Sequence, residues 1–239
     1  MNGIIFIKQY VVPWHKQVLF GKRVGCDVRL VECESTHGGL GVRVVLENHK
    51  EMVEFVVPSP GLHLALNACA AAAVASLLGV PLSQIGRCLS AFSPVKMRSE
   101  LEVARNGVKI VNDVYNANPV STRAAIDLLK SIDCKGKKIA ILGDMLELGA
   151  IELESHQMIL KHCCSVDDID LIGLVGKRFW TAARDMNMLE EVNIVCALEP
   201  ETFAEEIVRR VNCNDVILVK GSRGMQMEKV VNAIKAMEI

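Results

Sequence analysis

The second half of the chain alternates between short apolar runs and longer amphipathic stretches. Apolar runs bounded by polar turns are typical of strands buried on both faces, and they predict strands over residues 138–142, 171–175 and 216–219, with a weaker one over 193–196. The stretches between them predict helices near residues 119–131, 151–164, 177–186, 200–212 and 225–237. Strands that alternate with helices form a mostly parallel sheet with right-handed crossovers. We therefore expect an α/β, Rossmann-like domain, although the sequence holds no G-x-G-x-x-G fingerprint.

The first part of the chain has a different pattern. Valine-rich runs over residues 41–46 and 52–57 flank the polar turn 47–51, which predicts a β-hairpin. A helix is expected to begin at Gly61 and to reach residue 78, and a second, short helix, capped by Ser83, to end near residue 92. The first dozen residues hold only a short β-like run.

A boundary between two domains is expected in the segment 92–96. Beyond it, the Asn106-Gly107 turn between residues 101–105 and 108–111 predicts a second hairpin, because both turn positions tolerate a positive φ. The sequence therefore predicts one domain over residues 1–96 and a second, Rossmann-like domain over 97–239.

Composition excludes several classes of protein. A net charge of −1 gives no electrostatic reason to expect binding to nucleic acid or to a membrane surface. The longest apolar run, 64–80, is shorter than the ~20 residues that span a bilayer, and the first residues do not resemble a signal peptide. The nine cysteines show no C-x-x-C spacing, which favours free thiols in a reducing compartment over disulfides or a metal site. We expect a cytoplasmic protein, with the plastid stroma as the alternative.

Small and polar residues gather at the ends of three predicted strands, where open α/β sheets bind their ligands. The first group contains Asp113, Asn116 and Asn118, and Asn118 is also suited to cap the helix that begins at Pro119. The third group, Lys220-Gly221-Ser222-Arg223-Gly224, offers cations and a hydroxyl at a helix start, which suit a carboxylate or a phosphate.

The second group, the segment 143–149 followed by His156, has two possible interpretations. Asp144 and Glu147 could orient an amine or a metal-bound water. They could equally belong to a capped loop, and His156 could be an ordinary core or surface histidine.

Taken together, these segments resemble the Mur ligases, and among them the enzymes that add D-alanyl-D-alanine. The strings that carry the resemblance are D-V-Y-N-A-N-P at 113–119, L-G-D-M-L-E-L-G at 142–149 and V-K-G-S-R at 219–223. The resemblance also includes G-L-H at 61–63 with Asn67, and P-V at 94–95 with Arg98. It covers roughly residues 15–239. The D-N-P-R motif of the diaminopimelate-adding relatives is absent.

The resemblance implies an ATP-dependent amide ligase of peptidoglycan precursor synthesis. Such an enzyme activates the carboxylate of UDP-N-acetylmuramoyl-tripeptide as an acyl phosphate, with ATP and Mg²⁺, and the amine of D-alanyl-D-alanine then attacks it. Carried over residue by residue, the resemblance places Asn67 on the adenine, Arg98 on the nucleotide phosphates and Asp113 on the ribose. It implies a cleft for the dipeptide and the acyl phosphate that is lined by Asn116, Asn118, Lys220, Ser222 and Arg223.

The departures from this pattern concern the nucleotide. Leu64 stands where the family usually has Asn, and Val114 where it usually has Ser. The sequence also holds no G-x-x-x-x-G-K-[ST] phosphate loop. By this resemblance residues 1–96 are the tail of the family's central ATPase domain, and we expect the chain alone to be an inactive part of a ligase, with neither catalytic residues nor metal ligands of its own.

Two other hypotheses stay open. The first is a non-catalytic binding or scaffold protein derived from a Mur ligase, which the missing loop and Leu64 would favour. The second is a related folyl- or cyanophycin-type ligase, which the string Y-N-A-N at 115–118 argues against.

Overall fold

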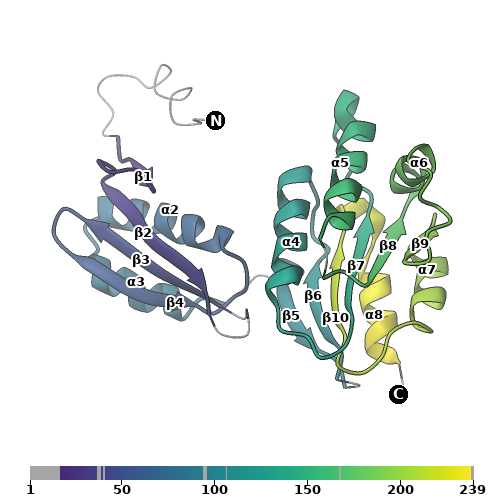
Figure 1. Cartoon of the computed structure of the whole chain (residues 1–239). Coiled ribbons are helices and arrows are strands. Elements are labelled where there is room, and N and C mark those ends of the chain that lie inside the picture. Colours follow the sequence, from purple (N-terminus) through teal and green to yellow (C-terminus); the bar gives the residue numbers. More distant parts are fainter. Residues whose placement is uncertain are drawn as a thin grey trace.

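The chain forms two α/β units in the computed structural model (Figure 1). The structure describes residues 17–36, 39, 41–93, 96–105, 107–166 and 168–237. The short run expected in the first dozen residues lies outside these ranges, as do Pro94 and Val95 in the expected boundary segment and Asn106 in the expected turn.

The first unit is a four-stranded sheet with two helices on one face (Figure 1). Its strands are β1 (Phe20–Gly21), β2 (Val28–Ser35), β3 (Val42–Asn48) and β4 (Met52–Val57). They lie side by side in chain order. The pair β1 and β2 is parallel, and the other two pairs are antiparallel. The expected hairpin is therefore confirmed as β3 and β4. The sequence analysis missed β2, whose alternation is interrupted by a register shift between Leu30 and Glu32.

The two helices are α2 (His63–Leu77) and α3 (Leu82–Ser90). Gly79 has φ +87° after the end of α2, as expected of a helix C-terminal cap. The expected cap of α3 by Ser83 is wrong, because the carboxylate of Glu51, in the hairpin turn, accepts from the backbone N–H of Leu82 at 2.8 Å and of Ser83 at 3.1 Å. These two bonds hold the pKa of Glu51 below its usual range.

The second unit is built on a six-stranded sheet in the order β5-β6-β10-β7-β8-β9. Its strands are β5 (Glu100–Val103), β6 (Lys109–Asp113), β7 (Lys138–Gly143), β8 (Leu171–Val175), β9 (Ile194–Ala197) and β10 (Val216–Lys220). All neighbours are parallel except β5 and β6, which form the expected second hairpin. The expected α/β fold with a mostly parallel sheet is thus confirmed.

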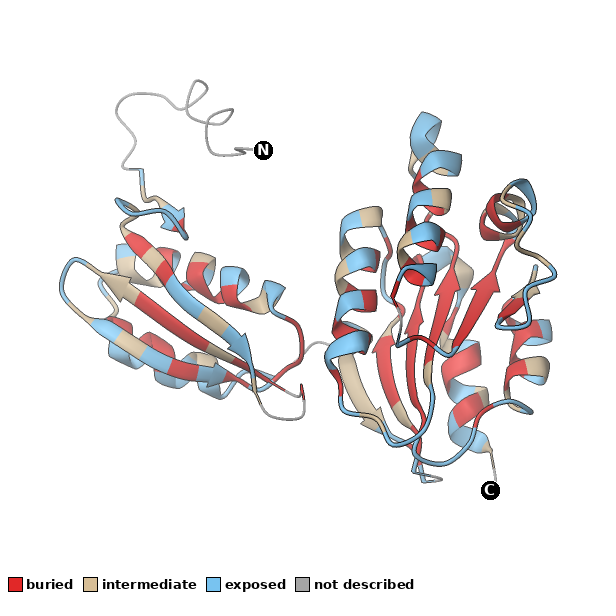
Figure 2. Ribbon diagram, in the orientation of Figure 1, coloured by how far each residue is buried: buried red, intermediate tan, exposed pale blue. Residues whose placement is uncertain are grey.

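Helices cover both faces of this sheet, so its central strands are buried (Figure 2). One core contains residues of α4 (Pro119–Ser131), α5 (Glu152–Cys164) and α6 (Lys177–Asp185), and the other contains residues of α7 (Pro200–Ile207) and α8 (Glu228–Ala236). Alternate residues of β7 belong to opposite cores, as the pleat requires. None of the helices in the described part of the chain has the length and apolarity that a membrane crossing requires.

Two helices are shorter than expected. The helix expected over 200–212 ends at Ile207, and the one expected from residue 225 begins at Glu228. The second difference arises because residues 223–225 form a short 3-10 helix, η3, that ends at Gln226 in the left-handed conformation, φ +50°.

Candidate functional site

The three polar strand ends lie next to one another, because β10 is inserted between β6 and β7. Lys220, the last residue of β10, is the register partner of Asp113, the last residue of β6, and of Leu142 on β7. All three strands are parallel, so their carboxyl ends share one edge of the sheet. This juxtaposition of segments far apart in the sequence is the basis of the site.

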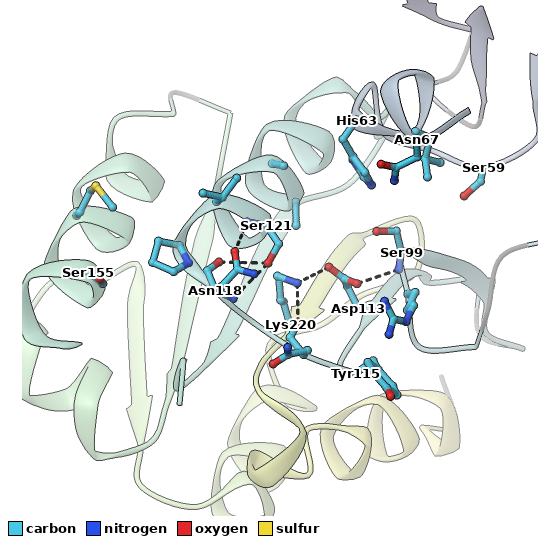
Figure 3. A pocket seen from close by; sticks show the side chains of 18 of the residues that line it. Ser59, His63, Asn67, Ser99, Asp113, Tyr115, Asn118, Ser121, Ser155 and Lys220 are labelled. Carbon is cyan, nitrogen blue, oxygen red and sulfur yellow. Dashed lines mark hydrogen bonds and ion pairs between the residues drawn. The ribbon is translucent and has the colours of Figure 1, made fainter. Parts of the chain in front are cut away.

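An ion pair lies at the centre of this edge (Figure 3). The ammonium of Lys220 is 2.5 Å from Oδ2 of Asp113 and donates to the backbone carbonyl of Asn116 at 2.9 Å. Oδ1 of Asp113 accepts from the backbone N–H of Ser99 at 3.0 Å. The Lys220 side chain is only 2% exposed and that of Asp113 14%, so each charge is compensated by a buried partner. The pair fixes the strand ends and leaves Asp113 lone pairs for one further donor.

A cavity of about 990 Å³ opens above this pair, between the two units (Figure 3). The first unit contributes to its lining through α2, the segment before it and the end of the unit after α3. The second contributes through the segment before β5, through β6 and the loop after it, and through α4, α5 and β10. Its lining residues are Ser59, His63, Leu64, Asn67, Phe92, Arg98, Ser99, Asp113, Tyr115, Asn116, Asn118, Pro119, Val120, Ser121, Ala124, Ala125, Ile151, Ser155, Met158 and Lys220. A volume of this size accommodates a ligand as large as a nucleotide or a short peptide.

The cavity brings together the three residues that the resemblance assigns to the nucleotide: Asn67, Arg98 and Asp113. The guanidinium of Arg98 lies over the ring of Tyr115 at 4.1 Å from its centroid, a cation–π contact that orients an exposed cation. Tyr115 is part of the D-V-Y-N-A-N-P string, but the sequence analysis assigned it no role in the site. Its signal was an aromatic residue two positions after the strand-end carboxylate of Asp113.

His63 is another polar lining residue to which the sequence analysis assigned no role. Its ring lies against Gly61, which has φ +113° and no room for a side chain. Burial lowers the pKa of His63, the negative charge of Asp113 raises it and the positive charge of Lys220 lowers it. These opposing effects show that His63 shares the electrostatic environment of the ion pair.

Two of the residues expected to bind substrate also have structural partners. Asn118 is the N-cap of α4, with its side chain accepting from the backbone N–H of Ser121 at 2.8 Å in a reciprocal capping box. Asn116 directs its side-chain oxygen to the backbone N–H of Ala117 at 2.8 Å. The expected cap by Asn118 is confirmed, and both residues also line the cavity.

Ser222 and Arg223 do not line this cavity. The buried hydroxyl of Ser222 accepts from the backbone N–H of Leu146 at 2.9 Å, which ties the loop after β10 to the loop after β7. The side chain of Arg223 is 56% exposed and pairs with Glu228 at 3.0 Å. The Ser222 hydroxyl also donates to the backbone carbonyl of Ala117 at 3.4 Å, so Ser222 lies beneath the loop that carries Asn116 and Asn118 without lining the cavity, whereas Arg223 points away from these residues.

The loop after β7 has the geometry of a capped loop. Both carboxylate oxygens of Asp144 accept from backbone N–H groups at the start of α6, Arg178 at 3.0 Å and Phe179 at 2.9 Å. Nε2 of the fully buried His156 accepts from the backbone N–H of Met145 at 3.0 Å, and its Nδ1 lies 2.7 Å from the carbonyl of Glu152. These partners suit a neutral imidazole that carries its proton on Nδ1. Burial lowers the pKa of His156, which also favours the neutral form.

The donor set of the cavity fits a nucleoside better than a metal ion. The amide of Asn67 suits a base, and the exposed guanidinium of Arg98, which lies over the ring of Tyr115, suits a phosphate. The carboxylate of Asp113 has lone pairs left for a ribose hydroxyl. The carboxylate of Asp113 is already compensated by Lys220. Across the described ranges, no group of three or more His, Cys, Asp or Glu side chains is placed to hold a metal.

Comparison with known proteins gives consistent matches. Residues 97–223 match the family described as "Mur ligase, glutamate ligase domain". A UDP-N-acetylmuramoyl-tripeptide–D-alanyl-D-alanine ligase of Bacillus subtilis is 35% identical over 181 residues, which are 74% of this chain and 39% of the relative. The corresponding Treponema pallidum ligase is 33% identical over 73% of this chain and 37% of its own length. The chain thus spans well under half the length of these relatives.

Solved structures agree with the sequence matches. A D-alanyl-D-alanyl ligase from Acinetobacter baumannii superposes with a TM-score of 0.79 at 26% identity, over 92% of this chain and 46% of that one. The MurF ligase of Thermotoga maritima, with a TM-score of 0.73 and 23% identity, shares the fold over 98% of this chain and 51% of its own. Since the family match alone covers more than half of the sequence, the chain belongs to the Mur ligase family.

Proposed function

We propose that the chain provides one half of the active site of a ligase that adds D-alanyl-D-alanine to UDP-N-acetylmuramoyl-tripeptide. The observation that carries this proposal is the cavity above the Asp113–Lys220 pair, where residues of both units that match the family's motifs face one another. The similarity to D-alanyl-D-alanine-adding ligases supports the choice of substrates.

On the nucleotide side, Asn67 would contact the adenine, Arg98 the phosphates and Asp113 the ribose. ATP, when bound, supplies the phosphoryl group that activates the carboxylate. Asp113 is held in place by Lys220 and Ser99, so it would accept a ribose hydroxyl without moving. The exposed Arg98, held by Tyr115, would supply positive charge to the phosphates. Magnesium, which the resemblance implies, would neutralise the charge that develops on the phosphates.

On the acceptor side, Asn116, Asn118, Lys220, Ser222 and Arg223 would form the cleft for the dipeptide and the acyl phosphate. The Lys220 ammonium donates to Asp113 and to the backbone carbonyl of Asn116, and its third N–H would donate to a substrate oxygen. Ser222 would act through the loop that it fixes. Arg223 would first have to leave Glu228.

These 239 residues contain no phosphate loop, and we propose that they do not turn over substrate alone. The nine free cysteines support a reducing compartment, so we place the protein in the cytoplasm, with the plastid stroma as the alternative.

The direct test mixes the purified chain with ATP, Mg²⁺, UDP-N-acetylmuramoyl-tripeptide and D-alanyl-D-alanine and measures phosphate release. We expect no release above the rate without protein, together with binding of ADP to the chain measured separately by calorimetry. Turnover of about 1 s⁻¹ or faster, a rate in the ordinary range for enzymes, would overturn the claim of inactivity.

One observation favours a second function, that of a non-catalytic binding protein. Leu64, which replaces the family's usual Asn, lines the cavity next to the α2 residues His63 and Asn67 and packs against the core of the first unit. An apolar side chain there removes one possible polar contact to the nucleotide. Restoring it with Leu64→Asn distinguishes the two functions: a nucleotide half-site gains affinity for ADP, and a site for another ligand does not.

A further inference from the structure

Arg98, which the proposed function assigns to the nucleotide phosphates, lies in a strained piece of backbone. Met97 has φ +64° and Ser99 has φ +50°, so the residues on both sides of Arg98 adopt the left-handed conformation. Residues other than glycine rarely adopt it, because their Cβ comes too close to the following carbonyl oxygen. Two such residues within three positions persist only where their surroundings hold them in place. We call residues 97–100 the arginine turn.

Three hydrogen bonds hold the arginine turn. The carboxylate of Glu100 accepts from the backbone N–H of Met97 at 3.0 Å, which closes the turn on itself. The carboxylate of Asp113 accepts from the backbone N–H of Ser99 at 3.0 Å (Figure 3). The backbone N–H of Tyr115 donates to the carbonyl of Met97 at 3.1 Å. The turn is therefore fixed both internally and to the end of β6 and the loop that follows it.

These bonds act on both the backbone and the side chain of Arg98. Its backbone lies between the two bonded residues Met97 and Ser99. Its guanidinium lies over the ring of Tyr115, at 4.1 Å from the centroid, and the backbone of Tyr115 is bonded to the same turn. The arginine and the ring beneath it are thus held together. An arginine that is already ordered loses less conformational entropy when it binds a phosphate.

Glu100 differs from the other residues that hold the turn. Asp113 and Tyr115 line the cavity, whereas Glu100 does not. Its negative charge, two positions after Arg98, opposes the binding of a phosphate nearby, because like charges repel. A favourable effect of Glu100 on phosphate binding therefore has to come from the bond that it accepts from Met97, and not from its charge.

We infer that Glu100 is a positioning residue, which closes the arginine turn and so preorganises Arg98 for a phosphate group of the nucleotide. The inference rests on the proposed nucleotide half-site and deepens it. It predicts that a carboxylate outside the cavity strengthens the binding of an anion, which is the opposite of the effect expected from its charge alone.

The test compares ADP with adenosine, which lacks the phosphates, by NMR titration of the wild type, Glu100→Ala and Glu100→Gln. We expect Glu100→Ala to bind ADP about threefold more weakly or worse, since the side chain of Arg98 must then be ordered on binding. Adenosine should bind this variant and the wild type equally. Glu100→Gln keeps an oxygen that can accept from Met97, so it should bind ADP at least as tightly as the wild type.

The matched control is Glu206→Ala, which removes the same charge from α7, where Glu206 pairs with Arg210 at 2.9 Å. Both of its affinities should equal those of the wild type. Tighter or unchanged binding of ADP by Glu100→Ala would overturn the inference. Equal weakening of ADP and adenosine would also overturn it, because a general loss of structure affects both ligands.

A second measurement does not depend on the nucleotide. The heteronuclear NOE of the Arg98 Nε–H, assigned by its absence from Arg98→Ala, reports fast motion of this side chain in mildly acidic buffer. It should be high in the wild type and in Glu100→Gln, and low in Glu100→Ala. A low value in the wild type, or no change in Glu100→Ala, would contradict positioning by Glu100. If the values differ as expected but the wild type does not bind ADP, the nucleotide half-site is wrong and the role of Glu100 in ordering Arg98 stands.

Discussion

At the residue scale, the site depends on two buried groups whose partners are fixed. Lys220 and Asp113 compensate each other at neighbouring strand ends. His156 is held neutral between a backbone donor and a backbone carbonyl. Both arrangements stabilise loops beside the cavity, so changes there affect stability before they affect binding.

Replacing Lys220 with Met leaves the carboxylate of Asp113 without its counter-charge. Breaking a buried ion pair by removing one partner typically costs about 3–5 kcal/mol, so we expect Lys220→Met to lower the free energy of unfolding by about 3 kcal/mol. The matched control, Lys229→Met, breaks the exposed pair with Glu201 and should cost far less, because solvent screens a surface pair. Urea denaturation measures both. Equal losses would show that the Lys220 pair is not buried in solution.

Protonation of His156 is expected to weaken the fold in mild acid. Burial lowers its pKa in the folded state, so below its ordinary pKa the unfolded chain binds more protons than the folded one and stability rises with pH. The stabilisation is complete above about pH 6.5 and is lost as the pH falls towards the folded-state pKa.

The free energy of unfolding of the wild type, measured from neutral to mildly acidic pH, should therefore fall more steeply than that of His156→Gln. His49→Gln, at a side chain that is 77% exposed, is the control substitution. Parallel curves for the wild type and His156→Gln would refute this account of His156.

At the element scale, local signals decided how much of the fold could be predicted. The bounds of α4 and β8 were expected correctly, because Asn118-Pro119 marks a helix start and the run 171–175 is uniformly apolar. The cap of α3 could not be found locally, since its acceptor Glu51 is more than thirty positions earlier in the chain. The late start of α8 depends on the left-handed residue Gln226, which no sequence pattern marked.

The N-cap of α4 allows a prediction that separates structure from binding. Asn118→Ala removes the acceptor for the backbone N–H of Ser121 and should cost about 1 kcal/mol. Asn118→Asp keeps a good cap and should retain nearly all of the stability. If Asn118 also contacts the dipeptide, as proposed, both variants weaken binding of D-alanyl-D-alanine. Thermal denaturation and calorimetry distinguish the two effects, and an unchanged affinity in Asn118→Asp would remove Asn118 from the site.

At the scale of the whole molecule, the sequence predicted that three loops lie at one edge of the sheet, but not where the side chains of each loop point. Asp113, Asn116, Asn118 and Lys220 converge on the cavity as expected. Ser222 and Arg223 do not line it, because the buried Ser222 hydroxyl is taken up by the backbone of Ala117 and Leu146 and the side chain of Arg223 pairs with Glu228. The sequence gives the order of these segments along the chain, but not the order of the strands in the sheet. The cavity forms where it does because β10 lies between β6 and β7.

The central claim is that this cavity is a nucleotide half-site, and titration of ADP into the purified chain tests it most directly. We expect a dissociation constant of about 1 mM or tighter, and Arg98→Ala should raise it about tenfold, the loss expected when a charged hydrogen bond to a phosphate is removed. Arg209→Ala, an exposed arginine outside the cavity, should leave the affinity unchanged. No saturable binding by the wild type, or equal affinities for wild type and Arg98→Ala, would contradict the account.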